Sequence, residues 1–319
     1  MRCRHWRLGL ALAGLMMHSQ VATAAATFLD GSLQLNYLSN MNNADLAVDR
    51  EDGFVTAARV SVKRREIIAP KWGVQYGARL EADWNTRFSN LNRGGLGLNG
   101  RLHWKPVVGY TKPWFALDAD VVLSQFSDSD IRDGIGSRFT LMSGARVTQK
   151  LSARVGYVFD WRTAFGGRAF DNRGHGLFAA FSFKPSKRLV FYGRYDARVG
   201  DVVSTAVPNN PVIAAAEVIE QDDAYGLGSV ASSAIGPGPG PGPGPGPGPG
   251  PGPGPGLLNN NTRFAYRIDA VSHQGRVGAN YAITPAMSVD VSGRYRATYG
   301  DGNNDYFGFN IQGALLYRF

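Results

Sequence analysis

Charged side chains recur at every second position in several stretches of this chain, beginning with Arg79, Glu81 and Asp83 and again over residues 194–198. Alternate residues of a β-strand share one face, so each run is expected to present its charges together. Arginine and carboxylate side chains on neighbouring strands pair across a sheet. Arginines that line a pore can instead select anions. These residue types therefore indicate ion pairing or solute selection.

Counting in twos along every alternating stretch collects a larger charged set on the same face. The set comprises Arg79, Glu81, Asp83, Arg101, His103, Asp118, Asp120, Arg138, Arg146, Arg154, Asp160, Arg162, Arg194, Asp196, Arg198, Asp290, Arg294 and Arg296. Two interpretations stay open. One is a lattice of ion pairs that stiffens the interior, and the other is a path for anionic solutes; the two are compatible.

Catalytic chemistry has little support. Three histidines follow residue 26, namely His103, His175 and His273. A nucleophile and its base must lie within hydrogen-bond distance, and no recognisable serine motif flanks any of these histidines. A hydrolase that uses His175 or His273 is therefore the least favoured hypothesis. We expect no catalytic residues and no enzyme activity.

Two further patterns are weak signals for a cofactor or a metal. Gly95, Gly97 and Gly100 match a dinucleotide-binding fingerprint, but they lie within an alternating strand and no helix follows them. The acidic loops near 128–133 and 301–305 lack the spacing of a calcium-binding EF-hand loop. We expect neither cofactor nor metal.

The elements that must position the charged face are strands. The last thirteen residues alternate strictly, and their apolar set is Phe307, Phe309, Ile311, Gly313, Leu315, Tyr317 and Phe319. Period two means one apolar face and one polar face. Strands of an outer-membrane barrel have this pattern because one face meets lipid and the other faces a hydrated lumen.

The amino terminus predicts export. Arginines at 2, 4 and 7 precede an apolar run at 8–17, and small residues then offer cleavage sites after Ala24 or Ala26. This is the pattern of a signal peptide over residues 1–26. Cys3 lies within it, so the mature chain, 27–319, has no thiol. The net charge is +9, but the arginines recur singly, which argues against a nucleic-acid-binding patch.

Loop lengths predict the topology. Six long polar loops alternate with five short turns, which requires twelve strands with both termini on the short-turn, periplasmic side; ten or fourteen strands are the alternatives. The predicted fold is thus all-β, a transmembrane antiparallel up-and-down β-barrel. The expected strands are 31–38, 53–64, 72–84, 94–105, 114–125, 138–148, 151–161, 174–184, 188–199, 271–283, 287–298 and 306–319.

The fifth long loop, 200–262, contains several unusual segments. Residues 236–256 alternate proline and glycine, which form neither helix nor sheet ladder and predict a flexible spacer. Residues 211–220 could form a short helix capped by Asn210 that lies over the barrel mouth or folds into it. Residues 263–270 alternate in the opposite phase to the next strand, which a bulge or an extramembrane strand extension would explain.

The segment Asn280–Arg296, followed by the terminal Leu-Tyr-Arg-Phe, resembles the last hairpin of Gram-negative outer-membrane, porin-like β-barrels. The resemblance implies that the final strand, with Tyr317 and Phe319, is the signal read by the barrel-assembly machinery. It also implies transit with periplasmic chaperones and an outer-membrane location, in contact with lipid and lipopolysaccharide. It says nothing about a solute or an oligomeric state.

These observations favour a narrow porin-like channel with a charged lumen for small solutes, anions among them. The alternative is a surface adhesion or ligand-binding barrel, or a purely structural one, that acts through its outer loops.

Overall fold

The computed structural model describes residues 25–107, 109–207, 210, 213, 216, 218–222, 224–225 and 263–319. The predicted signal peptide, up to residue 24, and the Pro-Gly tract lie outside the described residues. Within them, no helix is long and apolar enough to cross a bilayer.

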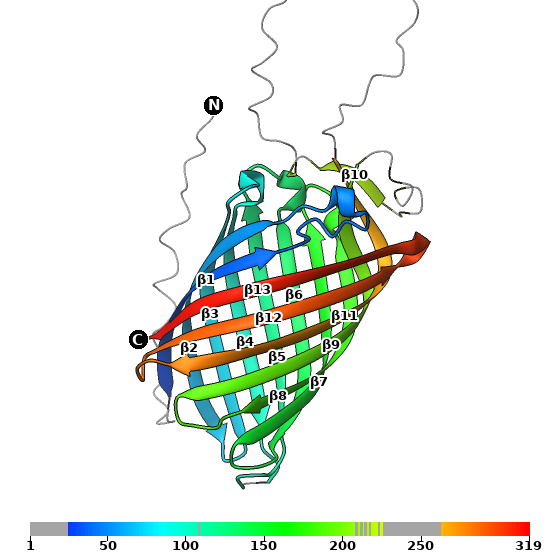
Figure 1. Ribbon diagram of the computed structural model, residues 1–319. Coiled ribbons are helices and arrows are strands. Elements are labelled where there is room, and N and C mark those ends of the chain that lie inside the picture. Colours follow the sequence, from blue (N-terminus) through cyan, green and yellow to red (C-terminus); the bar gives the residue numbers. More distant parts are fainter. Residues whose placement is uncertain are drawn as a thin grey trace, which may run out of the picture.

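Twelve antiparallel strands form a closed barrel in which chain neighbours pair and the last strand pairs with the first (Figure 1). A thirteenth strand, β10 (Val218–Asp222), pairs only with the beginning of β11. The barrel strands are β1 (Ala26–Leu38), β2 (Gly53–Ala69), β3 (Trp72–Asn85), β4 (Arg93–Trp104), β5 (Trp114–Phe126), β6 (Gly134–Arg146), β7 (Leu151–Ala164), β8 (Asn172–Phe183), β9 (Leu189–Ala206), β11 (Arg263–Ala282), β12 (Met287–Gly300) and β13 (Asn304–Arg318).

The prediction of twelve barrel strands is confirmed, and each predicted segment overlaps one of them. The fifth loop was predicted too long. β9 continues to Ala206 and pairs with β11 as far as Phe264, so the ladder extends beyond the predicted end of both strands. The predicted helix is wrong at its end, because Val218 and Ile219 lie in β10, where β-branched residues pair with the edge of β11.

The phase reversal over residues 263–270 lies within the first part of β11, and it comes from an extension of the strand rather than a bulge. The register between β9 and β11 is continuous over the whole pairing. Tyr266 and Ile268 therefore lie on the same face as Arg276, but they are buried by other protein segments instead of facing water. The face of β11 that carries polar side chains inside the barrel therefore carries buried apolar side chains in the loop region.

The outward face of the barrel carries exposed apolar side chains. Leu80 and Val277 expose 63% and 65% of their surface, which is unfavourable in water and favourable against lipid. Trp72 stacks on Trp104 with ring centroids 5.6 Å apart, and Trp84 lies at the other end of β3. This placement agrees with two aromatic girdles.

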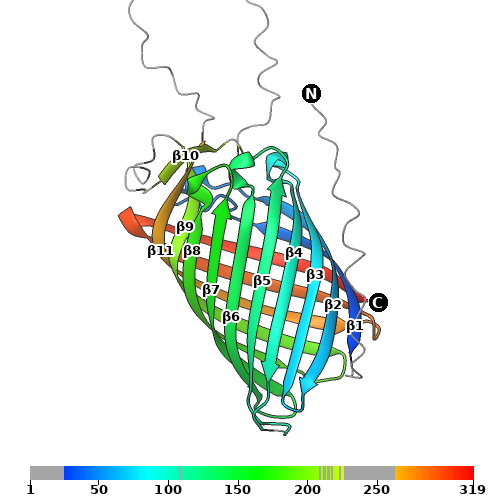
Figure 2. The ribbon, with the colours of Figure 1, turned by 180° about the vertical axis from the view of Figure 1, so that it is seen from behind.

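The two ends of the barrel differ. Short turns close one end, which we call the short-turn end. Within the described residues, the opposite loop end carries β10 and several 3-10 turns (Figure 1). These are η1 (Ala47–Asp49), η2 (Ser89–Leu91), η3 (Asp130–Arg132), η4 (Arg168–Phe170) and η7 (Asp301–Asn303). Figure 2, from behind, shows β3 to β7 running between the two ends.

Candidate functional site

The barrel encloses a polar cavity of about 1250 Å³. Its lining runs from the turn Thr284–Ala286, at the short-turn end, to Arg162 and Asn172, near the loop end. Charged side chains of β2 to β7 make up much of the wall, including Arg79, Glu81, Arg101, Asp118, Asp120, Arg138 and Asp160. The alternation of the strands therefore brings eight of the predicted charged residues to the lining of this cavity: Arg79, Glu81, Arg101, Asp118, Asp120, Arg138, Asp160 and Arg162.

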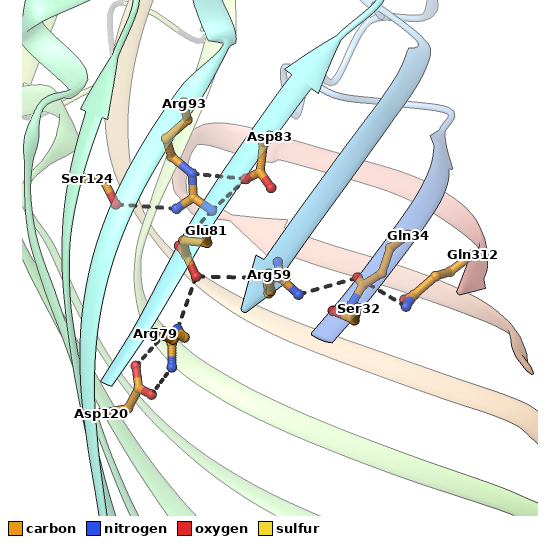
Figure 3. Close-up of polar contacts among 10 residues, drawn as sticks. All are labelled: Ser32, Gln34, Arg59, Arg79, Glu81, Asp83, Arg93, Asp120, Ser124 and Gln312. Atoms are coloured by element: carbon orange, nitrogen blue, oxygen red, sulfur yellow. Dashed lines mark hydrogen bonds and ion pairs between the residues drawn. The ribbon is translucent and has the colours of Figure 1, made fainter. Parts of the chain in front are cut away.

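Glu81 is the centre of the ion-pair network in this cavity (Figure 3). Its side chain contacts three arginines: Arg93 at 2.9 Å, Arg79 at 3.1 Å and Arg59 at 3.8 Å. Only 8% of Glu81 is exposed. One buried carboxylate thus contacts cations from three adjacent strands, which compensates the cost of burying its charge.

Small residues on β4 make this network possible. A Cβ atom on Gly97 would lie 2.9 Å from the Arg79 side chain, and one on Gly95 would lie 2.8 Å from the Glu81 side chain. Arg79 therefore crosses β4 and donates a 2.8 Å hydrogen bond to Asp120 on β5. Gly95 and Gly97, two of the three glycines that match a dinucleotide motif, therefore have a structural role here, because they let charged side chains lie flat along the wall.

Polar contacts continue from Arg59 around the barrel. Arg59 donates to Gln34 on β1 at 3.3 Å, and Gln312 on β13 donates to the same oxygen at 3.3 Å (Figure 3). Arg276 on β11 then donates to Gln312 at 3.3 Å and to the Tyr192 hydroxyl on β9 at 3.3 Å. Together with the contacts of Glu81 and Arg79, this belt joins side chains from β5, through β3, β2, β1 and β13, to β11 and β9.

The other predicted residues divide into paired and unpaired groups. The ion pairs are Arg93–Asp83 at 2.5 Å, Arg101–Asp118 at 2.6 Å, Arg194–Asp196 at 2.6 Å and Arg198–Asp160 at 2.8 Å. Asp290 accepts a 2.8 Å hydrogen bond from Tyr192, Arg146 lies over the Tyr110 ring, and Arg296 donates to Asn43. Among the described residues no ion-pair partner is found for Arg138, Arg154 or Arg294.

A second cavity of about 550 Å³ lies on the other side of the lumen. It is lined by Gln34, Asn36, Arg59, Asp83, Tyr192, Arg276, Asp290, Arg294, Asn310 and Gln312, with a few apolar neighbours. Arg59 and Leu316 line both cavities, so the two spaces meet at the belt.

The loop end is covered by a folded cap made from the outer loops. Asp222 of β10, of which only 1% is exposed, pairs with Arg132 of η3 and accepts a 3.0 Å hydrogen bond from Thr205 of β9. Tyr225 packs against Phe88 and donates a 2.9 Å hydrogen bond to the Met41 carbonyl. Burial raises the pKa of Tyr225 to about 12, so its hydroxyl remains a donor.

The first outer loop also reaches across the barrel mouth. The backbone N–H of Thr205 donates to the Asn42 carbonyl at 2.9 Å, and the Asn43 amide donates to the Val203 carbonyl at 2.8 Å. These contacts join the β1–β2 loop to the end of β9, which is separated from β1 by three strands, β13, β12 and β11. The cap is therefore built from both sides of the mouth.

The histidines lie apart from one another. His103 packs on Trp114 with ring centroids 5.5 Å apart, on the inward face. His175 and His273 lie on the outward face, where each hydrogen-bonds a tyrosine hydroxyl: Tyr157 and Tyr195 respectively, the latter at 2.7 Å. Tyrosine is the only side-chain hydrogen-bond partner found for either one within the described residues.

Sequence reasoning missed several residues of the site. Arg59, Arg93 and Arg276 belong to the charged lining. They have the opposite parity to the outward-facing Val60, Leu96 and Val277, so the period-two pattern of these strands would have found them. It also missed a loop that occurs three times. In each copy, the backbone N–H at the end of a strand donates a 2.7 Å hydrogen bond to the side chain seven residues later. The pairs are Asn85 with Asn92, Phe126 with Asp133, and Ala164 with Asp171. The signal available in the sequence was an Asn or Asp that follows the last residue of an alternating stretch by seven positions, three times in the chain.

Comparison with known proteins supports the architecture. No protein-family model and no curated protein matches the chain. An outer-membrane channel from Pseudomonas putida F1 superposes with a TM-score of 0.51 at 8% identity, over 92% of this chain and 96% of that one. The NanC porin matches at 10% identity with a TM-score of 0.43, over 90% and 98% of the two chains. The KdgM porin, solved with disordered oligogalacturonate, matches at 10% identity with a TM-score of 0.39, over 90% and 98%.

At these identities the likeness concerns the fold alone. The chain has the closed β-barrel architecture of outer-membrane channel proteins.

Proposed function

We propose that this protein is a narrow channel of the bacterial outer membrane that passes small hydrophilic solutes. The observation that carries the proposal is the polar cavity of about 1250 Å³ inside a barrel whose outside is apolar. A purely structural barrel could fill its interior with side chains. Here long side chains lie along the wall over glycines and leave the space beside them unfilled.

The charge of the lining favours anions. Eight carboxylates face inward from the strands, at 30, 81, 83, 118, 120, 160, 196 and 290, and basic side chains outnumber them. The excess includes Arg138, which is exposed to the first cavity. A narrow path of this kind lowers the energy of an anion and raises that of a cation.

Two glycines allow a matched test of the channel. Gly136 faces the cavity and Gly293 faces outward beside Val291, and a Cβ atom on either would have no neighbour within 4 Å. Recorded in planar bilayers, the unmodified protein should give discrete conductance steps. Gly136→Trp should reduce the step by about half or more, and Gly293→Trp should leave it unchanged. Absence of steps from folded protein would refute the channel.

The same proposal includes insertion of the protein into the outer membrane by the barrel-assembly machinery. Tyr317 and Phe319 stack edge-on with ring centroids 4.4 Å apart, and Phe319 exposes 72% of its surface. An exposed terminal aromatic pair suits recognition by the barrel-assembly machinery before insertion among lipid and lipopolysaccharide. Cleavage after Ala24 would leave β1, which begins at Ala26, whole. We expect no enzyme activity, since His175 and His273 face outward and contact tyrosines.

A further inference from the structure

We infer that the second cavity binds a small hydroxylated carboxylate and that Arg294 holds its carboxylate group. This inference deepens the proposed channel by naming a class of solute. It rests on the channel only for the route of that solute, because binding itself requires just the folded barrel.

The strand register places three arginines side by side on one wall. Arg276 on β11 lies opposite Arg194 on β9 and opposite Arg294 on β12. Arg194 is neutralised by Asp196 at 2.6 Å, whereas Arg276 lies 3.8 Å from Asp290. Positive charge that is not balanced locally therefore increases along the row toward Arg294.

Arg294 is the member of the row that can accept an anion. It is half-buried, its Nε atom is enclosed, and no hydrogen-bond partner for that atom occurs among the described residues. A partly buried guanidinium without a counter-charge is destabilising. A carboxylate would relieve this cost, because the planar guanidinium can donate two parallel hydrogen bonds to its two oxygens.

The acids in this cavity do not compete for that position. Asp290 already accepts a 2.8 Å hydrogen bond from Tyr192. Asp83 pairs with Arg93 at 2.5 Å. Both carboxylates are therefore engaged by other side chains, and Arg294 is left to a ligand.

The remaining lining specifies the rest of the ligand. Asn36, Asn310, Gln34 and Gln312 bring four amides into the cavity, and Asn310 lies opposite Arg294 in the register of β12 and β13. Amides both donate and accept hydrogen bonds, as hydroxyl groups do. A volume of about 550 Å³ is within the range of small-molecule sites. The ligand class is thus a carboxylate that also carries several hydroxyl groups.

Three probes separate recognition of the carboxylate by Arg294 from recognition of the hydroxyl groups by the amides. Gluconate has a carboxylate and hydroxyls, sorbitol has the hydroxyls alone, and acetate has the carboxylate alone. Titration calorimetry on the folded protein in detergent should show gluconate binding at least about tenfold more tightly than either. Equal affinity of gluconate and sorbitol would overturn the role of the arginine, and equal affinity of gluconate and acetate would overturn the role of the amides.

Variants then locate the site. Arg294→Gln should weaken gluconate binding about tenfold or more. Arg138→Gln is the matched control, because it removes an unpaired inward arginine from the first cavity. Asn310→Ala keeps the charge of the second cavity and should also weaken gluconate binding. This variant tests the site if Arg294→Gln does not fold. Unchanged binding in both cavity variants would overturn the site.

The result separates this inference from the channel. Conductance steps without gluconate binding would overturn the site and leave the channel standing. Binding that depends on Arg294, in a barrel without conductance, would support the site and refute the channel.

Discussion

The carboxylate of Asp133 accepts a 2.7 Å hydrogen bond from the backbone N–H of Phe126, the last residue of β5. The contact closes the loop that carries η3, and so places Arg132 where it meets Asp222. Asn92 makes the corresponding contact in the β3–β4 loop without a charge. An uncharged amide can therefore perform the same structural task.

Asp133 makes the stability of this loop depend on pH. Burial raises the pKa of its carboxyl above the usual value of 3.8, against the opposing effect of the Phe126 N–H. In the pH window between the unfolded and the folded pKa, the folded loop holds more protons, so its stability falls as the pH rises. Asp133→Asn keeps the acceptor oxygen and should remove this dependence.

Hydrogen exchange of the amides in residues 126–134 between pH 3.5 and 6, corrected for intrinsic rates, measures the effect. Protection should decrease with pH in the unmodified protein and stay level in Asp133→Asn. Asp128→Asn, an exposed acid of the same loop, should behave like the unmodified protein. A protection profile that rises with pH would contradict the assignment.

Glu81→Gln should destabilise the barrel strongly. The substitution leaves Arg59, Arg79 and Arg93 without their shared buried carboxylate, at a cost of about 3 kcal/mol. Asp118→Asn is the comparison, because its partner Arg101 is more exposed and its loss should cost less than about 1 kcal/mol. Urea unfolding in lipid vesicles measures both; equal costs would show that Glu81 is not the centre of the network.

The same Glu81→Gln change should shift selectivity. It removes one negative charge from the first cavity, so the permeability ratio of chloride to potassium should rise about twofold or more. The reversal potential in a salt gradient reports this ratio. A shift toward potassium would contradict an electrostatic role for the lining.

Gly97→Ala and Gly275→Ala should have opposite effects. A methyl group on Gly97 would meet the Arg79 side chain at 2.9 Å and displace it from Asp120, which should cost about 1–3 kcal/mol. Gly275 faces outward with no atom within 4 Å of a new Cβ, so alanine there should stabilise its strand by about 0.5 kcal/mol. Unfolding midpoints in urea compare the two, and a harmless Gly97→Ala would show that the close approach is not required.

Asp222→Asn should loosen the cap. The buried carboxylate pairs with Arg132 and accepts from Thr205, and a charged hydrogen bond of this kind contributes roughly 1.5–3 kcal/mol. Trypsin should then cleave after Arg132 about tenfold faster. Asp128→Asn is the control, and an unchanged cleavage rate in Asp222→Asn would mean that other contacts hold the cap.

Strand positions and faces follow from the chain alone. The alternation over Trp72–Trp84 places aromatic residues outside and Arg79 inside, because a strand has a period of two whatever it packs against. The alternation of long loops with short turns predicted twelve strands, because loop length can also be read from the local sequence. The same alternation identified Arg294 as an inward residue without indicating that it would be unpaired.

Only the tertiary structure decided which charges neutralise one another and what covers the loop end. Arg79 pairs with Asp120 across β4, and Asn43 contacts Val203 although 160 residues separate them in the chain. Such contacts depend on which strand ends lie at the same height after the barrel closes. Period-two patterns contain no information about that height, since it is set by the register of all the strands together.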